Sequence, residues 1–141
     1  MSQQANVQAN VELIQAAYAA FKRGDVQTIL DSVSDTVEWI AAPVEPLAGT
    51  YRGRDEVAGF FQKVNEIAEY SSFEPREYVA QGDRVIVLGS YRAKVKSTGR
   101  FYDCDWAMAF TVEDGKITEF QEFTDTATIT SALPAASAAG A

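Results

Sequence analysis

The stretch from Phe101 to Thr126 reads FYDCDWAMAFTVEDGKITEFQEFTDT and organises the rest of the chain. It predicts two strands joined at Asp114-Gly115, because this dipeptide accepts the positive φ angles of a hairpin turn. Side chains alternate between the two faces of a strand, so the first strand carries two rows. The bulky apolar row is Cys104, Trp106, Met108, Phe110 and Val112; the small, acidic row is Asp103, Asp105, Ala107, Ala109 and Thr111. Since small side chains leave room for a ligand, we expect the second row to line a cavity.

Composition narrows the classes of function. The 141 residues favour one domain, and the net charge of −8 is opposite to what nucleic acid or an anionic membrane requires. The chain has no histidine, which excludes His-based metal sites and triads, and its single cysteine, Cys104, has no partner for an intrachain disulfide. No segment has the run of about 18 apolar residues that a membrane span needs. We therefore predict a cytoplasmic protein without a metal, cofactor, nucleic-acid partner or membrane partner.

The residues before the hairpin predict three helices. An apolar stripe at helical spacing consists of Val7, Val11, Ile14, Tyr18 and Phe21. Gly24 ends that helix, and Asp25 caps a second, shorter one. Residues 36–41 read as a short strand followed by a Pro- and Gly-containing loop, and residues 53–56 open the third helix.

The second half of the chain predicts strands over 73–80, 84–96, 101–112 and 116–129. Helices followed by antiparallel strands indicate an α+β fold in which the three N-terminal helices pack on one face of the sheet. We expect a flexible segment at 1–7, one domain at 8–132 and a flexible, Ala-rich tail at 133–141.

The other face of the sheet also has to be covered. We assign to it the bulky row, including Trp106, Met108 and Phe110, together with Ile86 and Leu88. An apolar patch of this size is rarely exposed, so we predict a homodimer in which two sheets pack together, with Cys104 packed at the contact.

Four segments carry a resemblance to a known family. They are AAFKRGD at 19–25, SDTVEW at 34–39, PLAGTYRGRDEV at 46–57 and DGKITEFQEFTDT at 114–126. In their order along the chain and in their amino-acid sequence, they resemble the NTF2-like superfamily. The resemblance is greatest to its SnoaL-like, ketosteroid-isomerase-related branch and covers about residues 8–130. The resemblance implies a cone-shaped α+β half-barrel with a curved, mostly antiparallel sheet, a deep apolar pocket and dimerisation through the sheet. Isomerases, cyclases, hydrolases and binding domains all share this fold, so it does not assign a reaction.

The catalytic positions of ketosteroid isomerases are matched only in part. Tyr18 stands six residues before Gly24, where those enzymes have a tyrosine that binds the oxyanion. Trp39 stands at the position of their general base, and Ala107 stands at that of their protonated aspartate. Without a base within reach, we do not expect ketosteroid isomerase activity.

Two other branches of the superfamily give weaker matches. Members similar to limonene-epoxide hydrolase use an Asp-Arg-Asp arrangement, of which Asp125 matches the last-strand aspartate, whereas Gly89 and Tyr91 stand in the other two places. Polyketide-cyclase members rely on an acidic residue in the pocket, and Asp125 or Asp105 are the residues that could supply it.

The leading hypothesis is a SnoaL-like protein with an apolar pocket for a small hydrophobic metabolite. We predict Asp125, Tyr18 and Asp105 as catalytic residues in a cofactor-free, acid–base reaction of the isomerase or cyclase type. Alternatives remain open: a non-catalytic binding domain, an activity like that of epoxide hydrolases, or an assembly module acting through the sheet. Tyr18 could also be a core residue, and Asp125 could cap a turn. The predicted ligand-binding residues are Trp39, Phe60, Tyr91, Ala107 and Phe123.

Overall fold

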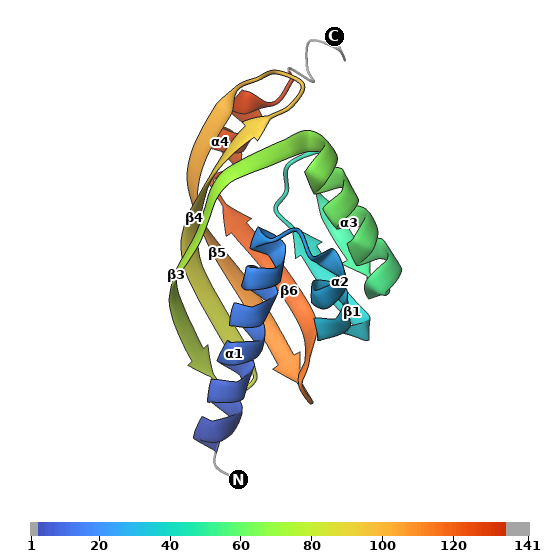
Figure 1. Ribbon diagram of the computed structural model, residues 1–141, viewed down its shortest axis with the longest axis vertical. Coiled ribbons are helices and arrows are strands. Elements are labelled where there is room, and N and C mark those ends of the chain that lie inside the picture. The colour runs from blue at the N-terminus through green and yellow to red at the C-terminus, as the bar shows by residue number, and fades with distance from the viewer. Residues whose placement is uncertain (1–2, 135–141) are drawn as a thin grey trace.

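The computed structural model describes residues 3–134 and has four helices and six strands in that range (Figure 1). Their order is α1 (Gln3–Lys22), α2 (Val26–Ser32), β1 (Val33–Ala41), β2 (Gly49–Arg52), α3 (Gly53–Ile67), β3 (Ala68–Gln81), β4 (Arg84–Val95), β5 (Phe101–Glu113), β6 (Lys116–Thr124) and α4 (Thr126–Ala132).

The six strands form one curved sheet in the order β2-β1-β6-β5-β4-β3. All neighbouring strands are antiparallel except β1 and β6, which are parallel. In Figure 1, α1, α2 and α3 lie over the same face of this sheet, while α4 lies near the end of β4 and β5. The predicted α+β class, with the first three helices on one face, is confirmed. Among the described residues, no helix is both long and apolar enough to cross a membrane.

Local sequence signals explain several element boundaries. Asp114 and Gly115 have φ values of 51° and 75°, which is the left-handed geometry of a tight turn between β5 and β6. Asp25 caps α2, because its carboxylate accepts hydrogen bonds from the backbone N–H and the hydroxyl of Thr28. Both features follow the prediction.

Several boundaries differ from the prediction, including the starts of β1 at Val33 and of β3 at Ala68, which precede the predicted residues 36 and 73. Residues 49–52 pair with β1 as β2, although we predicted a loop there. The last strand ends at Thr124 instead of continuing to residue 129, because Asp125 caps α4 by accepting from Thr128 in the same way that Asp25 caps α2. The first helix begins at Gln3, and residues 1–2 and 135–141 lie outside the described range.

The orientation of β5 is opposite to the predicted one. Its bulky row faces the helices and is buried, with Trp106, Met108 and Phe110 exposed by only 3%, 7% and 3%. The prediction that these side chains form a dimer contact is therefore wrong, and Cys104, which is also buried on the helix side, cannot pack there either. Alternation determines which residues share a face of the strand, but not which face the helices cover. Burial of the large apolar row under the helices removes more apolar surface from water.

Candidate functional site

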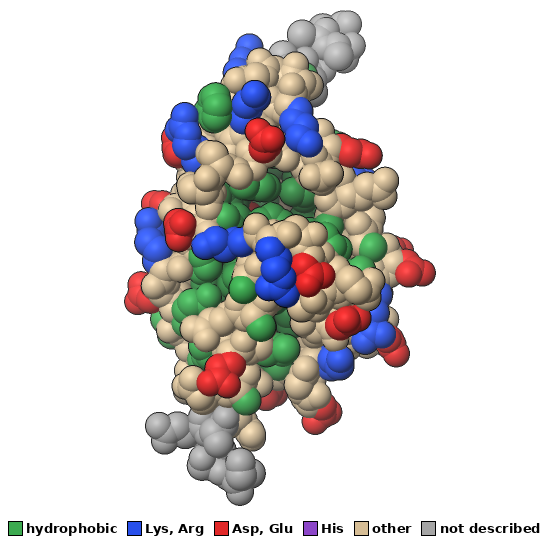
Figure 2. All heavy atoms as spheres, in the orientation of Figure 1, with side chains coloured by type: hydrophobic (Ala, Val, Ile, Leu, Met, Phe, Trp, Pro, Cys, Tyr) green, Lys and Arg blue, Asp and Glu red, His purple; other side chains and the backbone are tan. Residues whose placement is uncertain are grey.

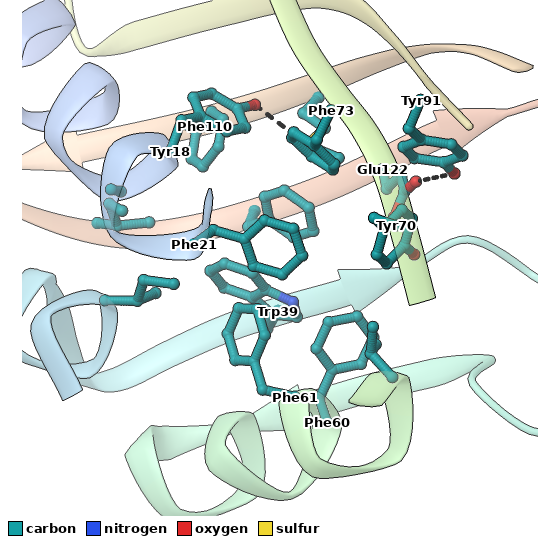
Figure 3. Close-up of a pocket in the computed structure, with 16 residues that line it drawn as sticks. Tyr18, Phe21, Trp39, Phe60, Phe61, Tyr70, Phe73, Tyr91, Phe110 and Glu122 are labelled. Atoms are coloured by element: carbon teal, nitrogen blue, oxygen red, sulfur yellow. Dashed lines mark hydrogen bonds between the residues drawn. The ribbon is translucent and has the colours of Figure 1, made fainter. Parts of the chain in front are cut away.

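An aromatic cavity lies between the helices and the sheet (Figure 3). Its volume is about 70 Å³, and residues from α1, α2, α3 and from strands β1 and β3–β6 surround it. The lining residues are Ala17, Tyr18, Phe21, Ile29, Trp39, Phe60, Phe61, Val64, Tyr70, Phe73, Tyr91, Met108, Phe110, Ile117, Phe120 and Glu122. This is room for about two water molecules at the roughly 30 Å³ that each occupies in the liquid, and it is smaller than the roughly 150 Å³ apolar cavity that accepts benzene. A ring that enters it must displace side chains or remain partly in its mouth.

A wider groove of about 730 Å³ adjoins the cavity. The groove and the cavity share five lining residues: Phe21, Phe61, Val64, Tyr70 and Phe73. Figure 2 shows hydrophobic side chains between the helices and the strands in the middle of this face. The ring of Phe21 lies 4.9 Å from that of Phe73 and 6.0 Å from that of Phe61, so these rings form a thin aromatic wall between groove and cavity. A ligand can reach the cavity from the groove if this wall moves.

Glu122 on β6 is the one carboxylate among the residues that line the cavity. Its Oε2 accepts a 2.7 Å hydrogen bond from the hydroxyl of Tyr91 on β4 (Figure 3). Glu122 as a residue is half-buried, and this burial raises the pKa of its carboxyl group more than the hydrogen bond from Tyr91 lowers it. A carboxyl group with a raised pKa titrates closer to neutral pH, where proton transfer is most effective.

Tyr91 is itself held in position by further contacts. Its hydroxyl oxygen lies 3.3 Å from that of Thr124, and the Thr124 hydroxyl lies 3.0 Å from Cys104 Sγ. Burial, followed by the charge of Glu122, raises the pKa of the Tyr91 phenol far above its ordinary value. Tyr91 therefore keeps its proton and donates to Glu122.

Tyr18 on α1 also lines the cavity. Its ring stacks on Trp106 with a centroid distance of 5.7 Å, and its hydroxyl donates to Met108 Sδ at 3.1 Å. Burial raises the pKa of this phenol well above the ordinary value, so it too stays protonated. Thioether sulfur is a weak acceptor, so the Tyr18 proton is available to a stronger acceptor that enters the cavity.

Of the eight predicted site residues, four line the cavity: Tyr18, Trp39, Phe60 and Tyr91. The other four, Asp105, Ala107, Phe123 and Asp125, do not, and their predicted place in the cavity is wrong. Asp105 and Ala107 belong to the outward row of β5, and Phe123 is 52% exposed. The Asp105 carboxylate lies 3.3 Å from the guanidinium of Arg76 at the surface.

Asp125 is exposed and performs the capping role that was the alternative interpretation. Hydrogen bonds from Thr128 hold the pKa of its carboxyl group below the usual value, whereas a residue walled in by Trp39 and Phe60 would show the opposite shift. Asp125, Asp105 and Asp103 line a separate, open surface depression with Ser90, Tyr91 and Cys104. With Asp125 outside and Gly89 and Tyr91 in the other two places, the epoxide-hydrolase triad has no counterpart in the cavity.

Glu122 and most of the phenylalanines around it were not predicted from the sequence. One signal was available, because Phe120, Glu122 and Thr124 alternate on one face of β6 while Gln121 and Phe123 alternate on the other. In the sheet, Glu122 pairs with Met108 and Phe120 pairs with Phe110, so assignment of the bulky row of β5 to the cavity would have brought Glu122 with it. The wrong face assigned to the bulky row of β5 is therefore the reason that Glu122 on β6 was not predicted in the cavity.

Helices that cover one face of a curved, mostly antiparallel sheet and enclose an apolar cavity define an NTF2-like protein. The chain belongs to the family of SnoaL-like domains, whose model matches residues 14–120. The predicted family and fold are thereby confirmed.

The chain is also similar to three known proteins. An NTF2-like protein of Burkholderia xenovorans LB400 is 42% identical, with 91% of this chain and 98% of that chain covered and a TM-score of 0.83. TerC, co-crystallised with polyporic acid, is 30% identical, with 88% and 97% covered and a TM-score of 0.77. An uncharacterised protein of Mycobacterium tuberculosis is 29% identical over 115 residues, which are 82% of this chain and 88% of the relative.

Proposed function

We propose that this protein binds a small, ring-bearing hydrophobic molecule in the aromatic cavity and that Glu122 transfers a proton on it without a cofactor. The observation that carries the proposal is the Glu122 carboxylate, which is held by Tyr91 at 2.7 Å in a cavity whose other lining residues are apolar or aromatic. A pocket of apolar walls with few polar groups is the usual form of a small-molecule site.

The chemistry assigned to Glu122 is that of a general base or acid. The raised pKa makes the carboxylate a better proton acceptor than an exposed one, and the aromatic walls exclude water that would compete with the ligand. Tyr91 orients the carboxylate but does not reach the cavity as a free donor, because its hydroxyl is already engaged. The hydroxyl of Tyr18 is the phenol that can turn from Met108 Sδ to a developing oxyanion.

Similarity supports a ring-bearing ligand. TerC, at 30% identity and a TM-score of 0.77, was co-crystallised with polyporic acid. In this chain, the aromatic rings around the cavity offer flat and edge contacts of the kind that rings make with one another.

A non-catalytic binding domain is the second candidate, because the same cavity would serve it. The deciding experiment begins with a thermal-shift screen of neutral ring compounds against the wild-type protein. Compounds that raise the melting temperature are then incubated with the protein and followed by NMR for proton exchange, isomerisation or cyclisation. Proton exchange on the ligand that depends on Glu122 supports a catalytic role for the protein. Binding without any chemical change of the ligand supports a non-catalytic binding role.

We also propose a homodimer through the outer face of the sheet, in which the predicted Leu88 is kept and Phe123 replaces the buried Trp106, Met108 and Phe110. On this face Leu88 pairs with Ala107, which pairs with Phe123, and Leu88 and Phe123 are 39% and 52% exposed. The ion pairs Arg84–Glu119 and Arg76–Asp105 lie on either side of this apolar strip. An apolar centre with charges of both signs at its rim suits contact with a second copy.

A further inference from the structure

Trp39 carries a buried polar group that no described residue satisfies. Its indole Nε1 exposes less than 1 Å² and has no hydrogen-bond partner. Trp106 Nε1 and Ser34 Oγ are also buried without a hydrogen-bond partner. Of these three residues, only Trp39 lines the cavity. Buried N–H groups are nearly always paired in native proteins, so this exception requires an explanation. Because the nitrogen exposes less than 1 Å², a ligand oxygen reaches it only when side chains of the cavity wall move.

The surrounding rings hold the indole in one orientation. Trp39 stacks on Phe120 with a centroid distance of 3.9 Å and an interplanar angle of 20°, and it packs against Phe60 and Phe61 at 6.1 and 5.6 Å. In this orientation the N–H has no acceptor among the described residues. In Figure 3 the nitrogen of Trp39 lies on the side of the ring toward Tyr70 and Glu122.

Glu122 and Trp39 are neighbours through the register of the sheet. Trp39 on β1 pairs with Phe120 on β6, and Glu122 lies two residues further along β6 on the same face. A donor and an acceptor thus lie diagonally across two neighbouring strands on the floor of an otherwise apolar cavity. A molecule that satisfies both needs an oxygen acceptor and, close to it, a hydroxyl or acidic C–H group.

The charge of the ligand follows from the lining residues. They include no lysine or arginine, and Glu122 is the only residue among them that can carry a negative charge near neutral pH. A carboxylate or phosphate ligand would meet this carboxyl group without a compensating cation, which is costly in an apolar site.

We propose that Trp39 determines ligand specificity by donating its indole N–H to the carbonyl-type oxygen of a neutral cyclic or aromatic ligand. The hydroxyl or acidic C–H group of that ligand faces Glu122. This assignment rests on the proposed function, because it uses the same cavity and the same carboxyl group.

The test compares three probes of matched size: acetophenone, a neutral ketone; ethylbenzene, which lacks the acceptor; and benzoate, which is an anion. The chain has two tryptophans, so a ¹H–¹⁵N spectrum has two indole signals, and the one missing from Trp39→Phe identifies Trp39. We expect acetophenone to shift the Trp39 signal downfield and ethylbenzene not to do so, while the Trp106 signal serves as an internal control. One net hydrogen bond corresponds to a preference of up to about tenfold for the ketone, and benzoate should bind most weakly.

Trp39→Phe keeps an aromatic ring for the stack on Phe120 and removes only the donor, so it should abolish the preference for acetophenone over ethylbenzene. The wild-type spectrum decides the matter even if this variant does not fold. A Trp39 indole signal that stays in place when acetophenone is bound would overturn the proposal, as would an unchanged preference in Trp39→Phe. If none of the probes binds, this assignment and the proposed function fail together. If the ketone preference is found but ligand chemistry does not depend on Glu122, the assignment stands and the proton-transfer function fails.

Discussion

The hydroxyl of Tyr91 donates a 2.7 Å hydrogen bond to Glu122, and this contact crosses from β4 to β6 over the strand that lies between them. It joins a phenol that keeps its proton to a carboxyl group whose pKa is raised by burial. The pair is the polar centre of an aromatic cavity.

Glu122→Gln preserves the shape of the side chain and removes the proton acceptor. For a ligand found by the thermal-shift screen, turnover should fall by about two to four orders of magnitude, while affinity changes little. Steady-state kinetics and calorimetric titration measure the two quantities. Asp125→Asn is the matched control, because asparagine caps a helix about as well as aspartate and Asp125 lies outside the cavity. Equal losses in both variants would contradict the role of Glu122.

Tyr91→Phe removes the hydroxyl that donates to Glu122. That hydrogen bond stabilises the charged carboxylate, so its loss should move the pKa of Glu122 further upward. A ¹³C NMR titration of the glutamate carboxyl carbons measures the change, with the Glu122 signal assigned by Glu122→Gln. A pKa that stays the same or falls in Tyr91→Phe would mean that the hydrogen bond does not form in solution.

The stability of the protein should depend on pH through Glu122. Its pKa in the folded state lies above the ordinary value of 4.5, so its stabilising contribution is complete below about that pH and is lost as the pH rises through the folded-state pKa. The free energy of unfolding of the wild type, relative to Glu122→Gln, should therefore fall over this interval. Urea unfolding at a series of pH values measures it. Asp125→Asn should show the opposite sign, with the contribution lost as the pH falls, because the pKa of Asp125 is lowered.

Gly89 lies beneath the ring of Trp106, on which the cavity residue Tyr18 stacks. A Cβ at this position would come within 2.5 Å of the Trp106 ring and closer still to the carbonyl oxygen of Glu74. Gly89→Ala should therefore cost about 1–3 kcal/mol in the free energy of unfolding, or more if the backbone cannot shift. Gly59→Ala in α3 is the control, since its Cβ would meet no atom within 4 Å and alanine favours a helix by roughly 0.5–1 kcal/mol. Similar effects of the two changes in thermal or urea unfolding would show that Trp106 does not lie over Gly89.

Phe123→Lys should weaken the proposed dimer. It places a charge in the apolar strip beside Ala107 on the outer face of the sheet, where it would be desolvated by the second copy. Sedimentation at micromolar concentration should find a dimer for the wild type and a monomer for the variant. Phe101→Lys is the control, because Phe101 is 51% exposed but lies at the far end of β5, against Arg92. A wild-type protein that sediments as a monomer would remove the proposal.

Short-range patterns in the sequence were sufficient for the local structure. The Asp114-Gly115 turn, the apolar stripe of α1 and the cap at Asp25 depend on residues close to one another in the chain, so they could be predicted from it. Tyr18 and Trp39 were correctly expected at the cavity because the family resemblance placed them there. The Asp-x-x-Thr pattern that begins α2 recurs at Asp125–Thr128, so α4 was predictable from the same signal.

The choice of face was decided only by the tertiary structure. Alternation along β5 defines two rows, and either row could have met the helices as far as the strand alone is concerned. The helices cover the row of Trp106, Met108 and Phe110 because this burial removes most apolar surface from water. Because β6 pairs with β5, the same choice determines which side chains of β6 face the helices. Glu122, paired with Met108, faces the cavity, and Phe123, paired with Ala107, faces outward. The hydrogen bond of Glu122 with Tyr91 joins residues 31 positions apart, and no local pattern in the sequence encodes it.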